Sequence, residues 1–573
     1  MQKKWVMREN LAAQFEGDFD APDFIKNILF HRGVKTKEEA KKFFEPDYEK
    51  DLDDPLLILN MKKAAERIIR AIKNKEKIVV WGDYDADGIC AAAILHHFLK
   101  KTNCENFEIY IPDRNRENHG LNEKIIEEFS KKEVKLIITV DCGVSDYEET
   151  KKAKEMGIDV IITDHHIPPE KLPPANAIVN LYQKEEKYPF KDFSGAGVAF
   201  KLVSAILKQE SFGLAKGWEK WLLDLTAIAT ISDMVSLLDE NRTLVYYGLK
   251  VLAKTPRLGL KLLLRKLNLG ERITAEDVAF LIAPRINAAS RMDHAETGFY
   301  LLTTELYEEA EWLANRLEEM NIERKKMIED ALKEIKVEQN QALLPKILVV
   351  GKEKWPVAIA GLIATKIVEE YDRPACVWGK LSETEIKVSC RNNGSIDLVE
   401  LFNNVRGDIF NDFGGHPMAA GFNAQKDKIE ILEASLNDAL EKISKKEKGA
   451  AENILLIDAE LSLDEVNWDI YALLEKFEPF GMGNPKPVFL FSALKIEKVK
   501  TFGNGGLHLE LSFKKSNGEA IRAIGFFMSQ QSIRPSEGRI ESGNTINLCA
   551  SLDKNYYNGY NELRLKIVDL KLI

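Results

Sequence analysis

Three aspartates at alternate positions, directly after an apolar run, constrain this chain more than any other stretch. The segment Ile78–Cys90 reads IVVWGDYDADGIC and places Asp83, Asp85 and Asp87 between a strand-like run and a helix-like run that opens at Gly88. On an extended or tightly turning backbone, alternate side chains project to the same side. Three like charges crowded together repel one another unless a cation lies among them. The segment predicts a metal site at the end of a strand, with a solvated acidic turn as the alternative.

Further metal-ligating residue types follow other apolar runs. The residues concerned are Asp141 after 136–140, Asp164, His165 and His166 after 160–163, and Asp233 after the run AlaThrIleSer. In an open parallel α/β sheet, the carboxyl ends of the strands form one edge, and active sites lie there. Carboxylate oxygens with one or two imidazoles suit Mn²⁺ or Mg²⁺ better than a structural zinc site, which favours thiolates. The pattern therefore predicts a Mn²⁺ or Mg²⁺ centre built from several strand ends.

The order of these motifs resembles a known superfamily. The motifs are DYDADG (83–88), DCG (141–143), DHH (164–166), SDMV (232–235), IPDR (111–114) with GL (120–121), SGAGVAFK (194–201), PRINAASRM (284–292), NIER (321–324), FGGHPMAAGF (413–422) and PFGMGNPKPVF (479–489). Together they resemble the DHH phosphoesterase superfamily, and more closely its RecJ family of single-strand-specific 5′→3′ DNA exonucleases. The motifs extend over nearly the whole chain.

Length and periodicity predict several domains. A chain of 573 residues is too long for one core, and three or four domains are expected. Strand-like runs at 77–81, 107–111, 135–140 and 159–163 alternate with helical stretches, which favours a parallel sheet. Apolar residues three or four apart over 303–340 predict a long amphipathic helix, and five alternating runs after 493 predict a small barrel.

The fold class that follows is α/β. The resemblance implies a parallel-sheet DHH domain and a smaller α/β DHH-associated domain joined by a long helix, with a C-terminal OB-like β-barrel. We expect an N-terminal arm (1–60), a DHH catalytic domain (61–302), a connecting helix (303–345), a DHH-associated substrate-binding domain (346–450) and an OB-like nucleic-acid-binding domain (451–573). The stretch 445–453 has the composition of a linker.

Composition narrows the function classes. The net charge of −10 counts mildly against nucleic-acid binding, although Lys and Arg outnumber Asp and Glu twelve to eight within 493–573. The N-terminus lacks the apolar core of a signal peptide, and no apolar run approaches a membrane span, so no membrane association is expected. The six cysteines are scattered without a CxxC pair, which argues against a disulfide framework or a zinc ribbon and for a reducing cytoplasm.

The resemblance implies hydrolysis of phosphodiesters with two Mn²⁺ or Mg²⁺ ions. Carried over motif by motif, it gives as metal ligands Asp85, Asp87, Asp141, His165 and Asp233. Asp87 and Asp141 are the expected bridging ligands. As catalytic residues it gives His166, which would contact the phosphate or the leaving oxygen, Asp164, which would hold a histidine in its tautomer, and Asp83, which would bind a metal or support a ligand.

Substrate contacts are expected from both lobes. The residues are Arg114, Arg285, Asn287, Arg291, Arg391 and His416. His416 follows two glycines, which permit close approach of an anion to the backbone. Two segments depart from the family pattern: 355–361 lacks a histidine, and SerCysArgAsn (389–392) replaces a more usual Gly-Ser-x-Arg-Ser. Recognition of the strand end is therefore less well defined than the metal site.

The resulting hypothesis is a metal-dependent exonuclease that degrades single-stranded DNA from the 5′ end to mononucleotides in DNA repair and recombination. Its expected partners are single-stranded DNA and a helicase or single-strand-binding protein, and it is expected to be a monomer. One alternative is a DHH-family phosphodiesterase of short oligoribonucleotides or cyclic dinucleotides, which generally lacks the barrel. A second is a structural relative that has lost its metals, which the full set of acidic ligands disfavours.

Overall fold

The chain divides into two compact units in the computed structural model. The first comprises Asp54–Asp233 and Gly248–Asn453, and the second comprises Gln2–Asp53, Met234–Tyr247 and Ile454–Ile573. The structure describes residues 3–573 except 115, 116, 118, 339–343, 406, 408, 411, 445–453, 504, 505, 529–538, 558 and 559. The linker expected at 445–453 lies outside the described residues.

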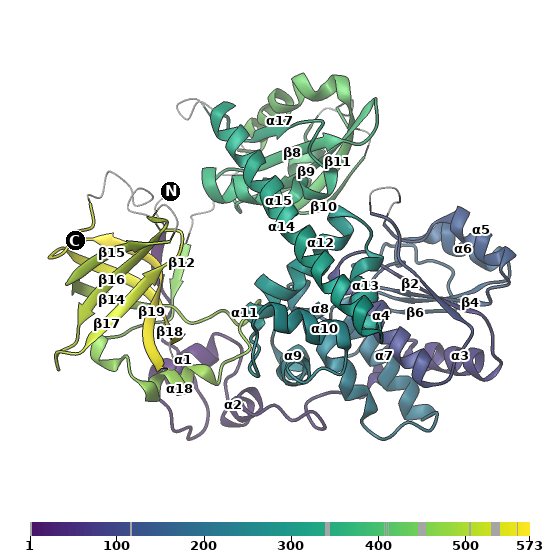
Figure 1. The fold of residues 1–573 in the computed structure, drawn as a ribbon, viewed down its shortest axis with the longest axis horizontal. Coiled ribbons are helices and arrows are strands. Elements are labelled where there is room, and N and C mark those ends of the chain that lie inside the picture. The colour runs from purple at the N-terminus through teal and green to yellow at the C-terminus, as the bar shows by residue number, and fades with distance from the viewer. Residues whose placement is uncertain are drawn as a thin grey trace. The chain divides into compact units, whose positions relative to one another are not determined.

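A five-stranded parallel sheet forms the base of the first unit (Figure 1). Its strands lie in the order β3 (Phe107–Tyr110), β2 (Ile78–Gly82), β4 (Leu136–Val140), β5 (Asp159–Thr163) and β6 (Ala177–Val179). Every residue of β2 and β4 is buried, as expected for parallel strands covered on both faces. The sequence-based prediction of a parallel α/β sheet is confirmed.

Helices cover both faces of this sheet. Val79, Trp81 and Ile137 pack against Phe129 of α5 (Glu123–Lys131) and Ala153 of α6 (Tyr147–Glu155). The other helices of this part of the unit are α3 (Met61–Lys73), α4 (Ala86–Lys101), α7 (Gly195–Gln209) and α8 (Leu223–Ser232). Figure 1 shows α3 and α7 on the side of the sheet opposite α5 and α6.

A helical region links this sheet to a second one. It contains α10 (Leu258–Lys266), α11 (Ala275–Asp277), a π-helical turn (Val278–Ile282), α12 (Ala283–Met292), α13 (Glu296–Thr303) and α14 (Tyr307–Glu338). The preceding helix α9 (Asp239–Leu252) belongs to the second unit up to Tyr247 and to the first unit from Gly248. α14 is 32 residues long, which confirms the long amphipathic helix predicted over 303–340.

The second sheet of the first unit is mixed. Its order is β10 (Asp412–His416), β11 (Ala419–Gln425), β9 (Glu385–Arg391), β8 (Ala375–Lys380) and β7 (Leu348–Gly351). Only the β7–β8 pair is parallel. Its helices are α15 (Val357–Tyr371), α16 (Leu398–Asn403) and α17 (Ile429–Ser444), so this part is the smaller α/β element that the sequence predicts.

The second unit is built on a seven-stranded sheet. Its order is β13 (Ala459–Glu460), β14 (Phe489–Lys495), β18 (Thr545–Tyr557), β19 (Tyr560–Leu572), β17 (Ala520–Gly525), β16 (His508–Lys514) and β15 (Lys498–Phe502). Helices α1 (Asp23–Phe30), α2 (Lys37–Phe44) and α18 (Trp468–Glu475) accompany it, and β1 (Lys4–Met7) pairs in parallel with β12 (Ile454–Ile457).

The N-terminal segment shares its core with this sheet. Ile28 and Leu29 of α1 and Phe43 of α2 lie in one apolar cluster with Phe489 and Phe491 of β14. The segment expected as an N-terminal arm (1–60) therefore contributes two helices to the core of the second unit.

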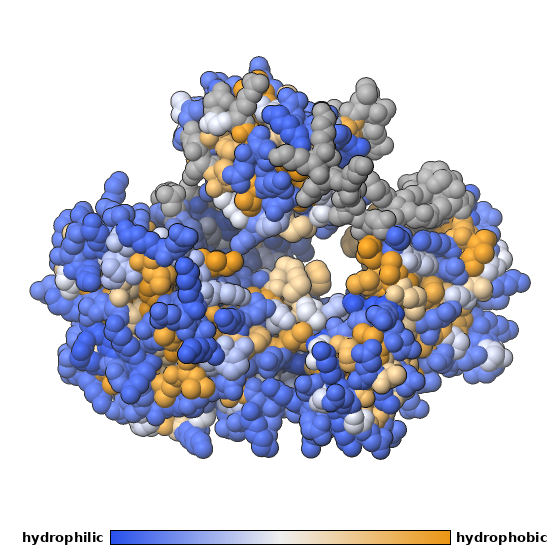
Figure 2. Space-filling model, turned by 180° about the vertical axis from the view of Figure 1, so that it is seen from behind, coloured by the Kyte–Doolittle hydropathy of each residue, from blue (hydrophilic) through white to orange (hydrophobic). Residues whose placement is uncertain are grey.

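The face of the molecule seen in Figure 2 is largely hydrophilic. On the face shown in Figure 2, hydrophobic residues occur in small groups among hydrophilic ones. Among the described residues, no helix combines the length and the apolar character that crossing a bilayer requires.

Candidate metal centre and substrate contacts

The three alternate aspartates lie at the carboxyl end of β2, where the chain turns into α4. Asp85 is the N-cap of α4, and its Oδ1 accepts hydrogen bonds from the backbone N–H groups of Asp87 (2.9 Å) and Gly88 (3.2 Å). Asp83 and Asp87 are buried. The N-cap bonds fix the turn, so the carboxylates are positioned by the helix start and not by solvent.

Asp87 joins this turn to the start of a second helix. Its two carboxylate oxygens accept hydrogen bonds from the backbone N–H groups of Gly195 and Ala196, each at 2.7 Å, at the N-terminus of α7. The positive end of the helix dipole favours a carboxylate at this place. A Cβ on Gly195 would lie 2.4 Å from Cβ of Asp141, so only glycine permits this close approach.

Asp141 occupies a strained position between the two helices. It follows β4, adopts the left-handed φ of 63° and is 2% exposed. Its Oδ1 lies 3.1 Å from Nε2 of His165 but accepts no hydrogen bond from the described residues. A buried carboxylate oxygen without a donor is costly in a protein interior. A bound cation would remove this cost.

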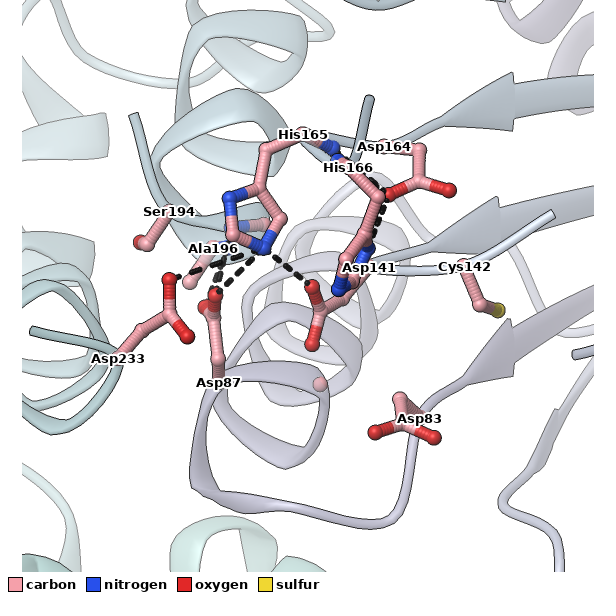
Figure 3. Close-up of polar contacts among 12 residues, drawn as sticks. Asp83, Asp87, Asp141, Cys142, Asp164, His165, His166, Ser194, Ala196 and Asp233 are labelled. Carbon is pink, nitrogen blue, oxygen red and sulfur yellow. Dashed lines mark hydrogen bonds and ion pairs between the residues drawn. The ribbon is translucent and has the colours of Figure 1, made fainter. Parts of the chain in front are cut away.

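His165 lies at the centre of the carboxylates. Its Nε2 is 3.8 Å from Asp87 Oδ2, 3.1 Å from Asp141 Oδ1 and 3.7 Å from Asp233 Oδ2, as the dashed lines of Figure 3 show. Asp233 is the C-cap of α8. Three distant segments of the chain thus direct oxygen atoms at one imidazole nitrogen.

The neighbouring pair of His166 and Asp164 is fixed by hydrogen bonds. Nδ1 of His166 lies 2.8 Å from Asp164 Oδ1, and the backbone N–H of Val144 donates to Asp164 Oδ2. Burial alone would raise the pKa of Asp164, but its bonds with the ring and backbone of His166 and with Val144 bring that pKa below its usual value. The ionised Asp164 therefore keeps the proton of His166 on Nδ1. Nε2 of the neutral ring is then unprotonated and free of Asp164.

Burial and mutual repulsion raise the pKa values of the other carboxyl groups. Burial, Asp83 and Asp87 raise the pKa of Asp85 to about 6, and burial with Asp87 raises the pKa of Asp233 to about 7. Burial, and then Asp87, raise the pKa of Asp141 well above its ordinary value. A divalent cation would reverse these shifts, because it favours the ionised carboxylates.

The donor set fits one or two hard divalent cations. Three groups have ligand atoms within 4.8 Å of one another: Asp141, His165 and His166; Asp87, His165 and Asp233; and Asp83, Asp85 and Asp141. Asp141 and His165 each belong to two groups. Oxygen and imidazole donors without a thiolate suit Mn²⁺ or Mg²⁺.

Sequence reasoning missed His119. Its Nδ1 lies 3.0 Å from Asp83 Oδ1, and its ring centroid is 5.7 Å from that of His166. The hydrogen bond with Asp83 raises the pKa of His119. Gly120 beside it adopts a φ of 89°, and a Cβ there would meet the Asp146 carboxylate at 2.3 Å. The only sequence signal was its position next to the Gly120-Leu121 motif.

Two of the residues expected to contact the substrate lie close to the acidic turn. The guanidinium of Arg114 lies 4.8 Å from the ring centre of Tyr84, between Asp83 and Asp85 in the sequence. Asn287 Oδ1 accepts a hydrogen bond from the N–H of Ala86 (2.9 Å), so this side chain supports the start of α4.

Three further expected contacts belong to the second sheet or to the helix facing it. Nη1 of Arg291 donates to the carbonyl of Ala358 on α15 (2.5 Å). Arg391 on β9 and His416 on β10 both align with Ala419 of the intervening strand β11. Residues aligned in this way point to the same face, roughly 10 Å apart over two strand spacings.

Arg285 differs from the other expected contacts. It is 6% exposed, forms an ion pair with Glu318 of α14 and donates to the carbonyl of Leu281 at 2.6 Å. Because Glu318 supplies the carboxylate partner, Arg285 links α12 to α14.

Family models match three parts of the chain. The N-terminal domain of the DHH family matches residues 77–230, the DHHA1 domain matches residues 344–447, and the RecJ OB domain matches residues 457–569. The first match contains the strand ends that carry Asp83, Asp141 and Asp164, and the third contains the seven-stranded sheet up to residue 569 of β19.

The chain is also similar to curated proteins named single-stranded-DNA-specific exonuclease RecJ. It is 36% identical to that of Bacillus subtilis, with 95% of this chain and 67% of that protein covered. It is 32% identical to that of Haemophilus influenzae (83% and 85% covered) and 28% identical to that of Escherichia coli (96% of each covered).

Solved structures agree with this similarity. The crystal structure of RecJ from Thermus thermophilus in complex with Mn²⁺ has a TM-score of 0.80 and 27% identity, and covers 99% of this chain and 79% of that chain. The complex of the same protein with Mg²⁺ has a TM-score of 0.75 and 25% identity, with 99% and 78% covered.

Proposed function

Because this chain belongs to the RecJ family, we propose that it is a metal-dependent exonuclease that hydrolyses single-stranded DNA. The observation that carries this proposal is the group of Asp87, Asp141 and Asp233, whose carboxylates surround Nε2 of His165. A relative of the same fold, RecJ from Thermus thermophilus, has been solved in complex with Mn²⁺ and with Mg²⁺.

The metal ligands in this proposal are Asp85, Asp87, Asp141, His165 and Asp233, with Asp83 beside them. Divalent ions held there supply activation of water and neutralisation of charge on the phosphate. Asp141 and His165 each belong to more than one ligand group, which supports Asp141 as a bridging carboxylate. Asp87 is the second proposed bridge, and the N-terminus of α7 orients it.

His166 and Asp164 form the proposed proton-handling pair. Asp164 accepts from Nδ1 of His166 and so presents Nε2 to the substrate, where the ring contacts a phosphate oxygen or the leaving oxygen. Since the pKa of Asp164 is lowered, the carboxylate stays ionised at neutral pH and holds the ring in this orientation.

The substrate strand is contacted, in this proposal, by Arg114, Asn287, Arg291, Arg391 and His416. Arg391 and His416 share one face of the second sheet, and Arg291 bonds to α15, which supports a binding surface contributed by both sheets of the first unit. Arg285 is a further proposed contact, although its guanidinium also forms an ion pair with Glu318.

The finer features of the proposal come from the family resemblance. They are digestion from the 5′ end to mononucleotides, a role in repair and recombination, a helicase or single-strand-binding partner, a monomeric state and a cytoplasmic location. The division into an arm (1–60), a DHH domain (61–302), a connecting helix (303–345), an associated domain (346–450) and an OB-like domain (451–573) is likewise our proposal.

The test is digestion of 5′- and 3′-labelled single strands with Mn²⁺, using the wild type and Asp141→Ala. We expect immediate release of the 5′ label as mononucleotide, abolished in Asp141→Ala and retained in Asp438→Ala, a control that removes an exposed carboxylate on α17. Survival of long DNA with cleavage of a dinucleotide would replace the proposal by a phosphodiesterase of short oligonucleotides.

A further inference from the structure

Two polar side chains on α14 are buried without the partners that burial requires. Asn321 is 1% exposed and Arg324, one turn later, is 9% exposed. Nη2 of Arg324 donates to Oδ1 of Asn321 at 2.8 Å, which fixes the two side chains relative to each other. Long connecting helices do not need such residues, because an apolar pair would pack at lower cost.

The same side chains leave hydrogen-bond donors unused. Nδ2 of Asn321 and Nε of Arg324 are buried and donate to no acceptor among the described residues, and Nε of Arg291 on α12 is in the same state. Leaving a buried donor unpaired costs roughly 1–3 kcal/mol, and more for a charged group. Three such donors on two packed helices indicate an acceptor with several oxygen atoms.

The charges nearby point to an anion. The pKa of Arg291 is lowered to about 9 by burial and then by Arg114 and Arg324, while Asp85 opposes the shift and Arg391 adds to it. Arg114 contacts Tyr84 of the acidic turn, and the positive charges of Arg114, Arg324 and Arg391 all act unfavourably on Arg291. A bound anion would offset this repulsion.

Arg285 shows what a structural arginine looks like in this region. Burial, and then the charge of Arg285, lower the pKa of Arg324. Arg285 itself has a carboxylate partner, Glu318. No carboxylate forms an ion pair with Arg324 or Arg291 among the residues that the structure describes. Arg285 thus has a carboxylate partner and joins two helices, whereas Arg291 and Arg324 have none within the described part of the chain and can bind an external anion.

We propose that Asn321 and Arg324, together with Arg291, bind a backbone phosphate of the substrate strand, so that α14 is a substrate-binding element as well as a connector. The inference rests on the proposed function, since it takes single-stranded DNA as the ligand. Its ligand class is an internal phosphodiester, whose two free oxygens accept from a guanidinium and an amide at once.

The experiment measures binding of fluorescent single strands to the full-length, metal-free protein by anisotropy. Each strand carries one uncharged methylphosphonate, placed in turn at successive positions from the 5′ end. Wild type, Arg324→Gln, Arg324→Lys and Lys325→Gln are compared. Lys325 is the matched control, because it is an exposed cation at the adjacent position of α14.

We expect Arg324→Gln to weaken binding roughly tenfold and to reduce the slope of log K against log salt by about 0.7, as for the loss of one phosphate contact. One methylphosphonate position should weaken binding by the wild type and by Lys325→Gln, and it should weaken binding by Arg324→Gln clearly less, because only Asn321 and Arg291 then contact that phosphate. If Arg324 were only structural, Arg324→Gln would weaken binding of every methylphosphonate strand by the same factor.

Equal methylphosphonate profiles in wild type and a folded Arg324→Gln would overturn the inference. If Arg324→Gln does not fold, Arg324→Lys carries the test: it should keep the salt slope and show a reduced effect at the same position, and an unchanged profile would refute the phosphate contact. A wild type that binds with this profile but digests no DNA would overturn the proposed function alone.

Discussion

A methyl group at Gly195 should disable the metal centre without disturbing the fold. Gly195 is the first residue of α7, its N–H binds Asp87, and a Cβ there would lie 2.4 Å from Cβ and 2.5 Å from Oδ1 of Asp141. Ordinary carbon contacts are about 3.5–4.0 Å, so Asp141 or the helix must move by roughly 1 Å. Metal ligands tolerate only about 0.5 Å of displacement.

The expected loss follows from this displacement. Changes that misplace ligands without removing them typically lower metal affinity by about 10–100-fold, and we expect a loss in this range for Gly195→Ala. The free energy of unfolding should fall by about 2 kcal/mol at most, because overpacking costs about 1–3 kcal/mol and alanine recovers up to about 1 kcal/mol over glycine in a helix.

The assay is Mn²⁺ titration of the exonuclease rate, with thermal unfolding measured alongside. Gly197→Ala is the matched control, since the atoms nearest to its Cβ would be those of the Phe193 side chain, at 3.2 Å and beyond, and not those of a proposed metal ligand. We expect Gly197→Ala to keep the half-saturating Mn²⁺ concentration of the wild type. The reasoning is refuted if Gly195→Ala keeps it as well, or if both variants lose affinity equally.

Three more predictions concern stability. Since the folded-state pKa values of Asp85 (about 6) and Asp233 (about 7) are raised by burial and nearby carboxylates, the metal-free protein should lose stability as pH rises from about 4 through 7. Melting of metal-stripped protein at pH 5 and pH 8 measures this, Mn²⁺ should stabilise more at pH 8, and a melting temperature that rises with pH would contradict it. Ser194→Ala removes the N-cap bond to Gly197 of α7 and should lower the free energy of unfolding by about 1 kcal/mol in urea titrations, whereas no loss would show that Asp87 alone caps the helix. Arg242→Met leaves four backbone carbonyls without their donor in the second unit and should destabilise that unit by about 3 kcal/mol or more, seen as an earlier urea transition; an unchanged transition would contradict a structural role.

The strand ends could be located from the sequence alone. The runs before Asp83, Asp141 and Asp164 are continuous and apolar, and such runs mark buried parallel strands whose carboxyl ends share one edge. The spacing of apolar residues over 303–340 likewise defined α14. These features depend on neighbouring residues, which is why local patterns reveal them.

Partners from distant segments could not be located in this way. Asp87 binds backbone groups 108 residues later, and His119 reaches Asp83 across 36 residues. Arg285, an expected contact to the substrate strand, forms an ion pair with Glu318, which is 33 residues away in the sequence. The sequence neighbours of a charged side chain do not determine which oppositely charged group it contacts in the tertiary structure.

The sequence by itself determined the kinds of ligand, the parallel sheet that presents them and the family. Only the tertiary structure decided that the N-terminal helices share the core of the second unit and that Asn321 and Arg324 are buried with unused donors. The physical reason is that periodicity records burial on one element, whereas a site depends on how several elements pack, and packing is a property of the whole unit.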